Sequence, residues 1–550
     1  MIVSAVLLRP LNEKGEIYMT QRFMCTQEAP VVQTKAGKLR GFMYDGIYTF
    51  HGIRYAKAAR FQAPQPVAPW EGIRDALSYG YICPVLNNPK PTGEVMTPHR
   101  FWPENEHCQY LNVWTKSLDT SAKKPVMVWF HGGGFSAGSS IVQVCYEGDH
   151  LAKYGDVVVV SVNHRLNVFG HLDMSMFGEK YKNSVNAGIA DLVAALGWIR
   201  DNIQGFGGDP GNVTIFGQSG GGGKVTTLGQ VPEAAGLFHK AIVMSGVLSD
   251  DMMSSDVDPR DLVLAILAEL GMEDTDADRL EKVPAYALVR AVNRAEKKLG
   301  AQGKHISWGP KPNEWYTGDP MGVGFSDYYK TVPTMVGTVM AEFGFDRPVK
   351  DKDMLSPEER EAIVAEKYGS ENAARIIELF KKAYPDKNEV LACNIDTMFR
   401  PTTLKYIREK ARTSSAPVYS YMFALEFDYD GGKPAWHCSD IPFVFHNADR
   451  IPICQIEGVT EALEYQVSMA WVNFARTGNP NIPQLPGWAP CTGDHLTTMV
   501  FDRKSEARVD YEEELLDLLA KTAKPFVFDP SMFADEDAEA EDADGRAWVF

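Results

Sequence analysis

A serine held between two glycines, in the pattern Gly-x-Ser-x-Gly, is the first candidate for chemistry in this sequence. The pattern occurs at 217–221 around Ser219 and at 134–138 around Ser136. Such a serine becomes an exposed nucleophile when a strand runs into the first glycine and a helix leaves the last, because the sharp turn lifts its hydroxyl above the sheet. An apolar strand is predicted directly before Ser219, whereas Ser136 lies several residues beyond its strand. We therefore predict that Ser219 is the nucleophile and that Ser136 is an ordinary loop serine.

The run His131-Gly132-Gly133-Gly134 lies upstream of this nucleophile. Glycines after a strand let the backbone approach a ligand and direct N–H groups at a developing oxyanion. A dinucleotide fingerprint at 132–137 is a poor alternative, because no clear helix follows it. A phosphate-binding loop ending at Lys224 is excluded, since it would need glycine and serine or threonine where the chain has Gln218 and Val225.

A serine hydroxyl is a weak nucleophile at neutral pH, so it needs a base nearby and an acid that orients the base. In hydrolases with such a strand-to-helix turn, the chain order is serine, acid, histidine. The histidines that follow the late predicted strands are His437, His446 and His495. His437 lies in a loop a dozen residues past the last of these strands, where a base can reach back over the sheet. His446 follows an apolar run and is expected to be structural. We predict His437 as the base, a choice that rests partly on resemblance to a known family.

The acid has three candidates in the stretch after the helical middle of the chain: Asp327, Glu342 and Asp346. Glu342 follows a predicted strand at 332–340 directly, which puts it at the sheet edge where parallel strands end. Asp327 precedes that strand, and Asp346 lies a turn beyond its end. We predict Glu342 as the acid.

Short, continuously apolar runs must supply the strands that position these residues. Runs without polar alternation are typical of strands buried on both faces, as in a parallel sheet. They lie at 125–130, 156–162, 213–216, 240–245, 332–340 and 417–425. Apolar residues recur with helical spacing over 187–203, and a helical stretch at about 251–326 interrupts the strands. We predict an α/β fold with a mostly parallel central sheet flanked by helices, and with helical insertions that form a cap over the site.

Composition supports a globular protein: 550 residues, 45% hydrophobic and 23% charged. A formal charge of -17 disfavours nucleic acid and anionic membrane surfaces as partners. Seven acids and one arginine fall within 535–546. We therefore expect one domain at 1–530 followed by a disordered acidic tail at 531–550.

Targeting signals and metal motifs are not apparent. No apolar run is long enough for a membrane span, and charged residues follow the opening apolar run at 2–8 directly, unlike in a signal peptide. We therefore expect a cytoplasmic protein. The eight cysteines form no CxxC pair, so no zinc site is predicted.

These motifs together resemble the type-B carboxylesterase family, the cholinesterase-like branch of the α/β-hydrolases. The resemblance runs from about Val31 to Asp502 and rests on the segments 50–56, 60–61, 69–70, 106–114, 131–135, 206–210, 216–221 and 471–480. It implies that Ser219, Glu342 and His437 form a triad that cleaves carboxylic esters through an acyl-enzyme. It further implies oxyanion donors at the backbone of Gly133, Gly134 and Gly220. The implied substrate is a small to medium ester, with no metal or cofactor required.

The sequence also departs from the family. The usual Gly-Glu-Ser-Ala-Gly is replaced, so that a neutral Gln218 stands beside the site and Gly220 follows the serine. Eukaryotic members pair the cysteines that match Cys83 and Cys108, which we expect to be reduced in this chain.

Other functions stay open at this stage. The same site could hydrolyse amides, carbamates or lactones. A non-catalytic binding protein of this fold is disfavoured, because every triad position is filled. The natural substrate and the oligomeric state are not determined by the sequence.

Overall fold

A twelve-stranded sheet organises the structure, a computed structural model that describes residues 22–86, 96–248, 254–344, 351–429 and 431–522. The acidic tail predicted at 531–550 lies outside these residues. The single domain predicted at 1–530 stays a prediction.

The central sheet is mostly parallel, as predicted. Its strand order is β1-β4-β5-β9-β11-β10-β12-β13-β14-β15-β18-β19. Neighbours from β11 to β18 pair in parallel, whereas β1, β4, β5, β9 and β19 pair antiparallel. The bounds are β1 (Phe23–Met24), β4 (Phe42–Tyr44), β5 (Ile47–Arg54), β9 (Tyr110–Thr115), β10 (Lys124–Phe130), β11 (Val158–Val162), β12 (Gly208–Gln218), β13 (Lys240–Met244), β14 (Thr334–Val339), β15 (Val418–Phe423), β18 (Thr497–Phe501) and β19 (Glu506–Val509).

Alternate side chains of the buried strands enter two different cores. In β10, Val126, Val128 and Phe130 pack on one face of the sheet, while Met127 and Trp129 pack on the other. The first core is completed by α3 (Ala187–Asn202), α4 (Gly220–Leu228) and α11 (Phe399–Thr413). The second is completed by α1 (Asp149–Gly155), α12 (Ile441–Val444) and α13 (Thr460–Thr477). The continuous apolar runs of the sequence are explained by this burial on both faces.

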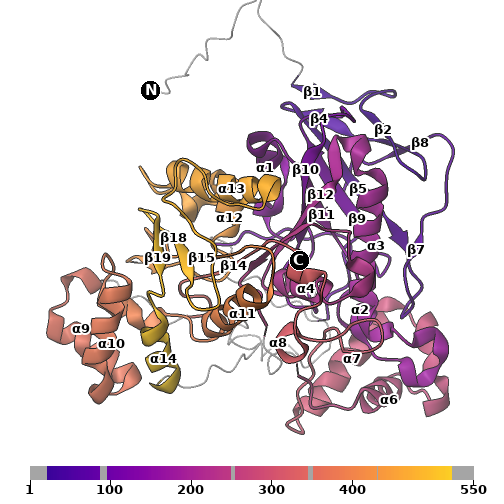
Figure 1. Cartoon of the computed structure of the whole chain (residues 1–550). Helices are drawn as coiled ribbons and strands as arrows, with labels where there is room; N and C mark the ends of the chain where they lie inside the picture. The colour runs from indigo at the N-terminus through magenta and orange to yellow at the C-terminus, as the bar shows by residue number, and fades with distance from the viewer. Residues whose placement is uncertain (1–21, 87–95, 249–253, 345–350, 430, 523–550) are drawn as a thin grey trace, which may run out of the picture.

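The predicted helical insertion is confirmed between β13 and β14. There α6 (Pro259–Glu269) and α7 (Ala285–Gly300) share a third core with α2 (Asn167–His171), and α8 (Pro320–Val323) follows. Between β14 and β15 lie α9 (Pro357–Tyr368) and α10 (Ser370–Ala383), and α14 (Glu513–Thr522) follows β19 and packs on α10. Figure 1 shows α9 and α10 at one end of the molecule, far from α6 and α7.

Three small sheets complete the described structure. Their strands are β2 (Val31–Gln33), β3 (Lys38–Arg40) and β8 (Ile73–Asp75), then β6 (Ala56–Lys57) with β7 (Gln65–Pro66), and β16 (Glu426–Phe427) with β17 (Lys433–Pro434). Within the described ranges, no helix combines the length and hydrophobicity needed to cross a bilayer.

The carboxyl ends of the parallel strands meet at one edge of the sheet. The loop 131–134 follows β10, and Ser219 follows the neighbouring β12, with Phe130 paired to Gly217. Glu342 follows β14, and the chain returns from β15 to His437. The topology therefore brings all the predicted site residues to this edge. In open α/β sheets, this is the edge at which ligands bind.

Candidate active site

Ser219 stands on a sharp turn between β12 and α4. Its backbone has φ 58° and ψ -129°, a conformation that a non-glycine residue adopts only where the surroundings enforce it. Its N–H donates to the carbonyl of Met244 at 2.8 Å, and its own carbonyl accepts the N–H of Gly223 at 3.0 Å. The serine is half-buried, whereas the residues on either side of it are buried. This is the strand-to-helix arrangement that the sequence predicts.

Glycines around the turn are required by close backbone contacts. A Cβ on Gly221 would lie 2.0 Å from the carbonyl oxygen of Phe130, and one on Gly220 would lie 2.2 Å from that of Gly134. Any side chain at these positions would push the loop after β10 away from the serine. The missing Cβ of Gly220 therefore leaves room for the neighbouring loop.

The loop 131–134 exposes amide hydrogens beside this turn. Gly133 and Gly134 have φ 86° and 60°, in the left-handed region that favours glycine. Gly133 is exposed and Gly134 is half-buried, and no acceptor for their N–H groups is found among the described residues. Gly220 is the first residue of α4, where the N–H has no partner within the helix. These three N–H groups are the predicted oxyanion donors.

Backbone pairing brings the predicted acid and base together. The N–H of Ala341 donates to Ala435 at 2.9 Å, and the N–H of His437 donates to Glu342 at 3.0 Å. His437 Nδ1 then lies 2.5 Å from Glu342 Oε2, while Glu342 Oε1 accepts the N–H of Val339 at 3.0 Å. Because the buried carboxylate accepts the Nδ1 proton, Nε2 of the neutral imidazole is left as a proton acceptor.

Gln218 contacts both nitrogens of the imidazole. Its Nε2 lies 3.2 Å from His437 Nε2 and 3.3 Å from Nδ1, and its Oε1 accepts the thiol of Cys438 at 3.2 Å. Hydrogen bonds from His437 to Ser219 Oγ are not found among the described residues. Bonds between base and nucleophile often form only when substrate is bound, so this geometry is compatible with proton transfer.

Two phenylalanines pack on the imidazole, and sequence reasoning missed both. The ring of His437 lies 4.3 Å from that of Phe343 and stacks on that of Phe399 at 5.4 Å. Phe343 adjoins Glu342, and Phe399 begins α11. No sequence motif pointed to them, because the contacts join segments far apart in the chain.

Two further buried carboxyl groups, those of Asp396 and Asp440, lie near Glu342. Asp396 accepts the N–H groups of Met398, Phe399 and Arg400 at the start of α11, and burial with the nearby Glu342 raises its pKa. Asp440 accepts the hydroxyl of Tyr421 at 3.1 Å. Burial first, and then the charge of Glu342, raise the pKa of Asp440 to about 7.

The remaining sequence candidates lie in other surroundings. Ser136 is a turn residue whose N–H donates to Gly133 at 3.2 Å. His446 bonds Ser468 Oγ at 3.1 Å, and burial lowers its pKa to about 4. His495 is exposed and pairs with Asp510.

The alternative acids are no better placed. The side chain of Asp327 is fully exposed and pairs with Lys330. Asp346 lies outside the described residues.

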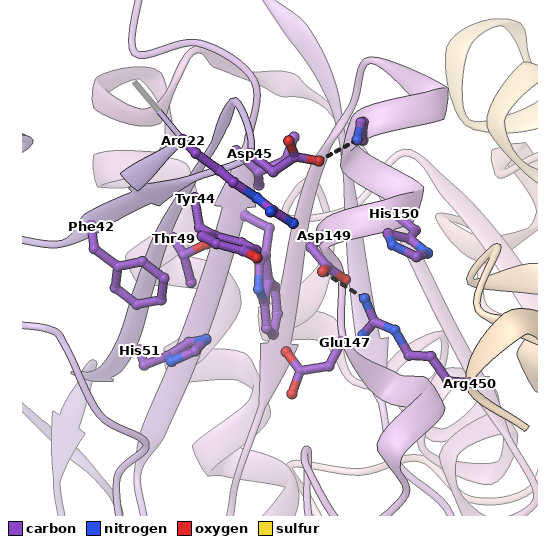
Figure 2. Close-up of a pocket in the computed structure, with 13 residues that line it drawn as sticks. Arg22, Phe42, Tyr44, Asp45, Thr49, His51, Glu147, Asp149, His150 and Arg450 are labelled. Carbon is purple, nitrogen blue, oxygen red and sulfur yellow. Dashed lines mark hydrogen bonds and ion pairs between the residues drawn. The ribbon is translucent and has the colours of Figure 1, made fainter. Parts of the chain in front are cut away.

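A separate pocket of about 310 Å³ lies between β4, β5 and α1. Figure 2 shows Arg22 lying over Tyr44, Asp45 paired with a lysine, and Asp149 paired with Arg450. None of the triad residues lines it. Among the described residues, no group of three His, Cys, Asp or Glu side chains could hold a metal ion.

The raised pKa of Asp440 predicts a pH-dependent stability. Because the folded pKa of about 7 exceeds the ordinary 3.8, this group destabilises the fold progressively as pH rises between these values. We expect Asp440→Asn to raise the melting temperature relative to the natural protein by a few degrees more at pH 8.5 than at pH 5.5. Thermal unfolding at both pH values measures this difference. Asp327→Asn, at an exposed site, should show no such pH dependence, and an Asp440→Asn effect that is equal at both pH values would contradict the prediction.

Comparison with known proteins identifies the family. The carboxylesterase family matches residues 28–518. The para-nitrobenzyl esterase of Bacillus subtilis is 33% identical over 500 residues, which cover 88% of this chain and 97% of that protein. The phenmedipham hydrolase of Pseudarthrobacter oxydans is 32% identical over 496 residues, covering 86% and 94%.

A solved structure agrees in sequence and in shape. An esterase from the anaerobic Clostridium hathewayi, described as able to hydrolyse aliphatic aromatic polyesters, is 49% identical and superposes with a TM-score of 0.88. The similarity covers 91% of this chain and 99% of that one. The predicted α/β-hydrolase fold is thereby confirmed. The chain belongs to the carboxylesterase family and is a carboxylic ester hydrolase.

Proposed function

We propose that this protein cleaves carboxylic esters with Ser219 as nucleophile, His437 as general base and Glu342 as the acid that orients the base. The observation that carries the proposal is the 2.5 Å contact between His437 Nδ1 and Glu342 Oε2, at the sheet edge where Ser219 stands on its turn. Nδ1 is thereby committed to the carboxylate, and Nε2 is available for the serine proton.

In the proposed reaction, Ser219 Oγ bonds to the ester carbonyl carbon while its proton passes to His437 Nε2. The carbonyl oxygen becomes an oxyanion, which accepts hydrogen bonds from the N–H groups of Gly133, Gly134 and Gly220. The bond from carbon to the alkoxy oxygen then breaks, and His437 returns its proton to the departing alcohol. Water repeats the same steps on the acyl-enzyme and releases the acid.

The imidazolium formed during the reaction is stabilised by the carboxylate of Glu342. The aromatic rings of Phe343 and Phe399 restrict the rotation of His437, so its ring keeps the orientation in which Nδ1 meets the carboxylate. Gln218 supplies an uncharged amide to the same ring.

We propose small to medium neutral esters as substrates. Gln218 stands where related enzymes carry a carboxylate, so the site has one negative charge fewer to attract a cationic alcohol group. The similarity to the Clostridium hathewayi esterase makes aliphatic aromatic polyesters the first polymeric substrates to test. Amides, carbamates and lactones would use the same groups and belong in the same substrate panel.

The assignment of the nucleophile predicts the outcome of two serine substitutions. Ser219→Ala should abolish hydrolysis of p-nitrophenyl acetate and labelling by a fluorophosphonate, because the attacking oxygen is removed. Ser136→Ala, the matched change in the other Gly-x-Ser-x-Gly pattern, should leave both largely intact. Mass spectrometry of the labelled peptide checks the site, and a label on Ser136 would overturn the assignment.

The assignment of the acid predicts a large kinetic effect with the fold retained. Glu342→Gln keeps the shape of the side chain but removes the charge that stabilises the imidazolium, so we expect kcat to fall roughly 10²- to 10⁴-fold. Asp327→Asn and Asp346→Asn serve as controls and should cost less than about tenfold. Steady-state kinetics on the three folded variants decide the matter. Full activity of Glu342→Gln beside an inactive Asp346→Asn would reassign the acid.

We also propose that the protein acts in the cytoplasm with Cys83 and Cys108 as thiols. Both side chains are buried, and the backbone N–H of Leu166 contacts Cys83 Sγ at 3.3 Å. In a reducing cytosol both should stay unlinked. Freshly lysed cells denatured at once in the presence of an alkylating reagent should therefore yield both cysteines in modified form by mass spectrometry. A stoichiometric link between them would argue for an oxidising compartment.

A further inference from the structure

A lysine is buried directly behind the loop that carries the predicted oxyanion donors. Lys224 lies on α4, one turn beyond Ser219, and its side chain is fully buried. Its Nζ donates to the carbonyl oxygens of His131 and Gly134, each at 2.9 Å. These two carbonyls mark the beginning and the end of the glycine run, and they lie 93 and 90 residues upstream of the lysine.

This lysine has no carboxylate partner in the described ranges. Burial lowers the pKa of Lys224 to about 7. The titratable groups near it are His131, His164 and His171, whose pKa values are lowered by burial, so they are neutral. An amine buried without a counter-ion costs free energy, which its two hydrogen bonds to carbonyls only partly offset.

Every carbonyl of the loop is bound by a donor. Lys224 binds the first and the last, the ring Nδ1 of His131 donates to Gly132 at 2.8 Å, and the N–H groups of Ser136 and Ala137 donate to Gly133. A peptide group whose oxygen is bound cannot turn over without breaking that bond. The N–H of Gly133 shares a peptide group with the carbonyl of Gly132, and the N–H of Gly134 shares one with the carbonyl of Gly133, so His131 and the turn hold these two donors directly. Lys224 holds the peptide groups on either side of them.

The position of the last carbonyl also explains Gly220. The oxygen of Gly134 lies 2.9 Å from Lys224 Nζ and would lie 2.2 Å from a Cβ at position 220. The alanine usual in the family does not fit while this oxygen is bound to the lysine. Gly220 and Lys224 are therefore two parts of one arrangement.

We propose that Lys224 is a positioning residue for ester hydrolysis, which binds both ends of the loop 131–134 so that the N–H groups of Gly133 and Gly134 point at the reacting carbonyl before substrate arrives. This inference rests on the proposed function, because it assigns a role within the oxyanion hole. Donors that are oriented in advance need no reorganisation during the reaction, which is the basis of their catalytic effect.

Lys224→Met tests the proposal, since it removes the hydrogen bonds and keeps an unbranched side chain. We expect kcat for p-nitrophenyl acetate to fall about 10- to 100-fold, less than the loss of a donor itself, with KM changed less than about threefold. A trifluoromethyl ketone forms a tetrahedral oxyanion adduct with the serine, so its inhibition constant should rise by the same factor as kcat/KM falls. A residue that acts only on stability would not change that affinity.

Lys410→Met is the matched control. Lys410 is also buried, has a pKa lowered by burial to about 7, and donates to the carbonyl of Tyr329 at 2.6 Å. It lies near the far end of α11, away from the triad. Its replacement should lower the melting temperature but leave kcat and the inhibition constant within about twofold of the natural values.

The outcomes separate this inference from the proposed function. Unchanged kcat and inhibitor affinity in folded Lys224→Met, or losses equal to those of Lys410→Met, would overturn the role of Lys224. If Lys224→Met does not fold, Lys224→Gln, which keeps an amide donor, should lose about 3- to 10-fold in kcat, and an unchanged value would overturn the proposal equally. Fluorophosphonate labelling that maps away from Ser219 in the natural protein would instead overturn the proposed function.

Discussion

The close passage of two glycine-rich loops at the ends of β10 and β12 is the constraint on which the rest of the site depends. The strands are neighbours with Phe130 paired to Gly217, so the chain segments that follow them leave the sheet side by side. Backbone atoms of Phe130 and Gly134 occupy the places that side chains at 221 and 220 would fill. This contact brings the N–H groups of one loop next to the serine of the other.

The second half of the site is built in a different way. Acid and base come from loops after β14 and β15, which continue to pair beyond the ends of the strands through Ala341 with Ala435 and Glu342 with His437. The backbone thus sets the distance between two side chains that lie 95 residues apart in the chain. The ring of Phe343, next to the acid, and the ring of Phe399, from α11, pack on the imidazole, so the orientation of the base depends on several separate elements.

Electrostatics distinguish this chain from the usual pattern of its family. A neutral amide replaces the carboxylate before the serine, while Glu342, Asp396 and Asp440 remain buried on the side of the acid. A buried amine lies on the opposite side, behind the oxyanion loop. The carboxyl groups therefore lie beside the imidazole, and the amine lies behind the loop whose N–H groups are proposed to bind the oxyanion.

Local patterns in the sequence predicted the central strands and the candidate residues. Continuous apolar runs predicted β10 to β15, because burial on both faces leaves no polar alternation, and helical spacing predicted α3. The parallel strand β18 and the antiparallel strands at the two edges of the sheet were not predicted. The turn around Ser219 and the glycines at 132–134 were identified because backbone conformation and close approach restrict which residues can stand there. Glu342 could be chosen from its position at a strand end, whereas the choice of His437 also rested on the resemblance to the family.

The contacts between distant segments were decided only by the tertiary structure. Phe343, Phe399 and Asp396 have no sequence signature, since apolar and acidic residues are common after strands and near helix starts. Lys224 was considered from the sequence only as part of a phosphate-binding loop, and that test failed. Its partners are two carbonyl groups in the loop after β10. Because every residue has a backbone carbonyl, the sequence does not indicate which ones a lysine will bind. A residue's own type restricts its local conformation, whereas its partners are determined by how the strands are ordered in the sheet.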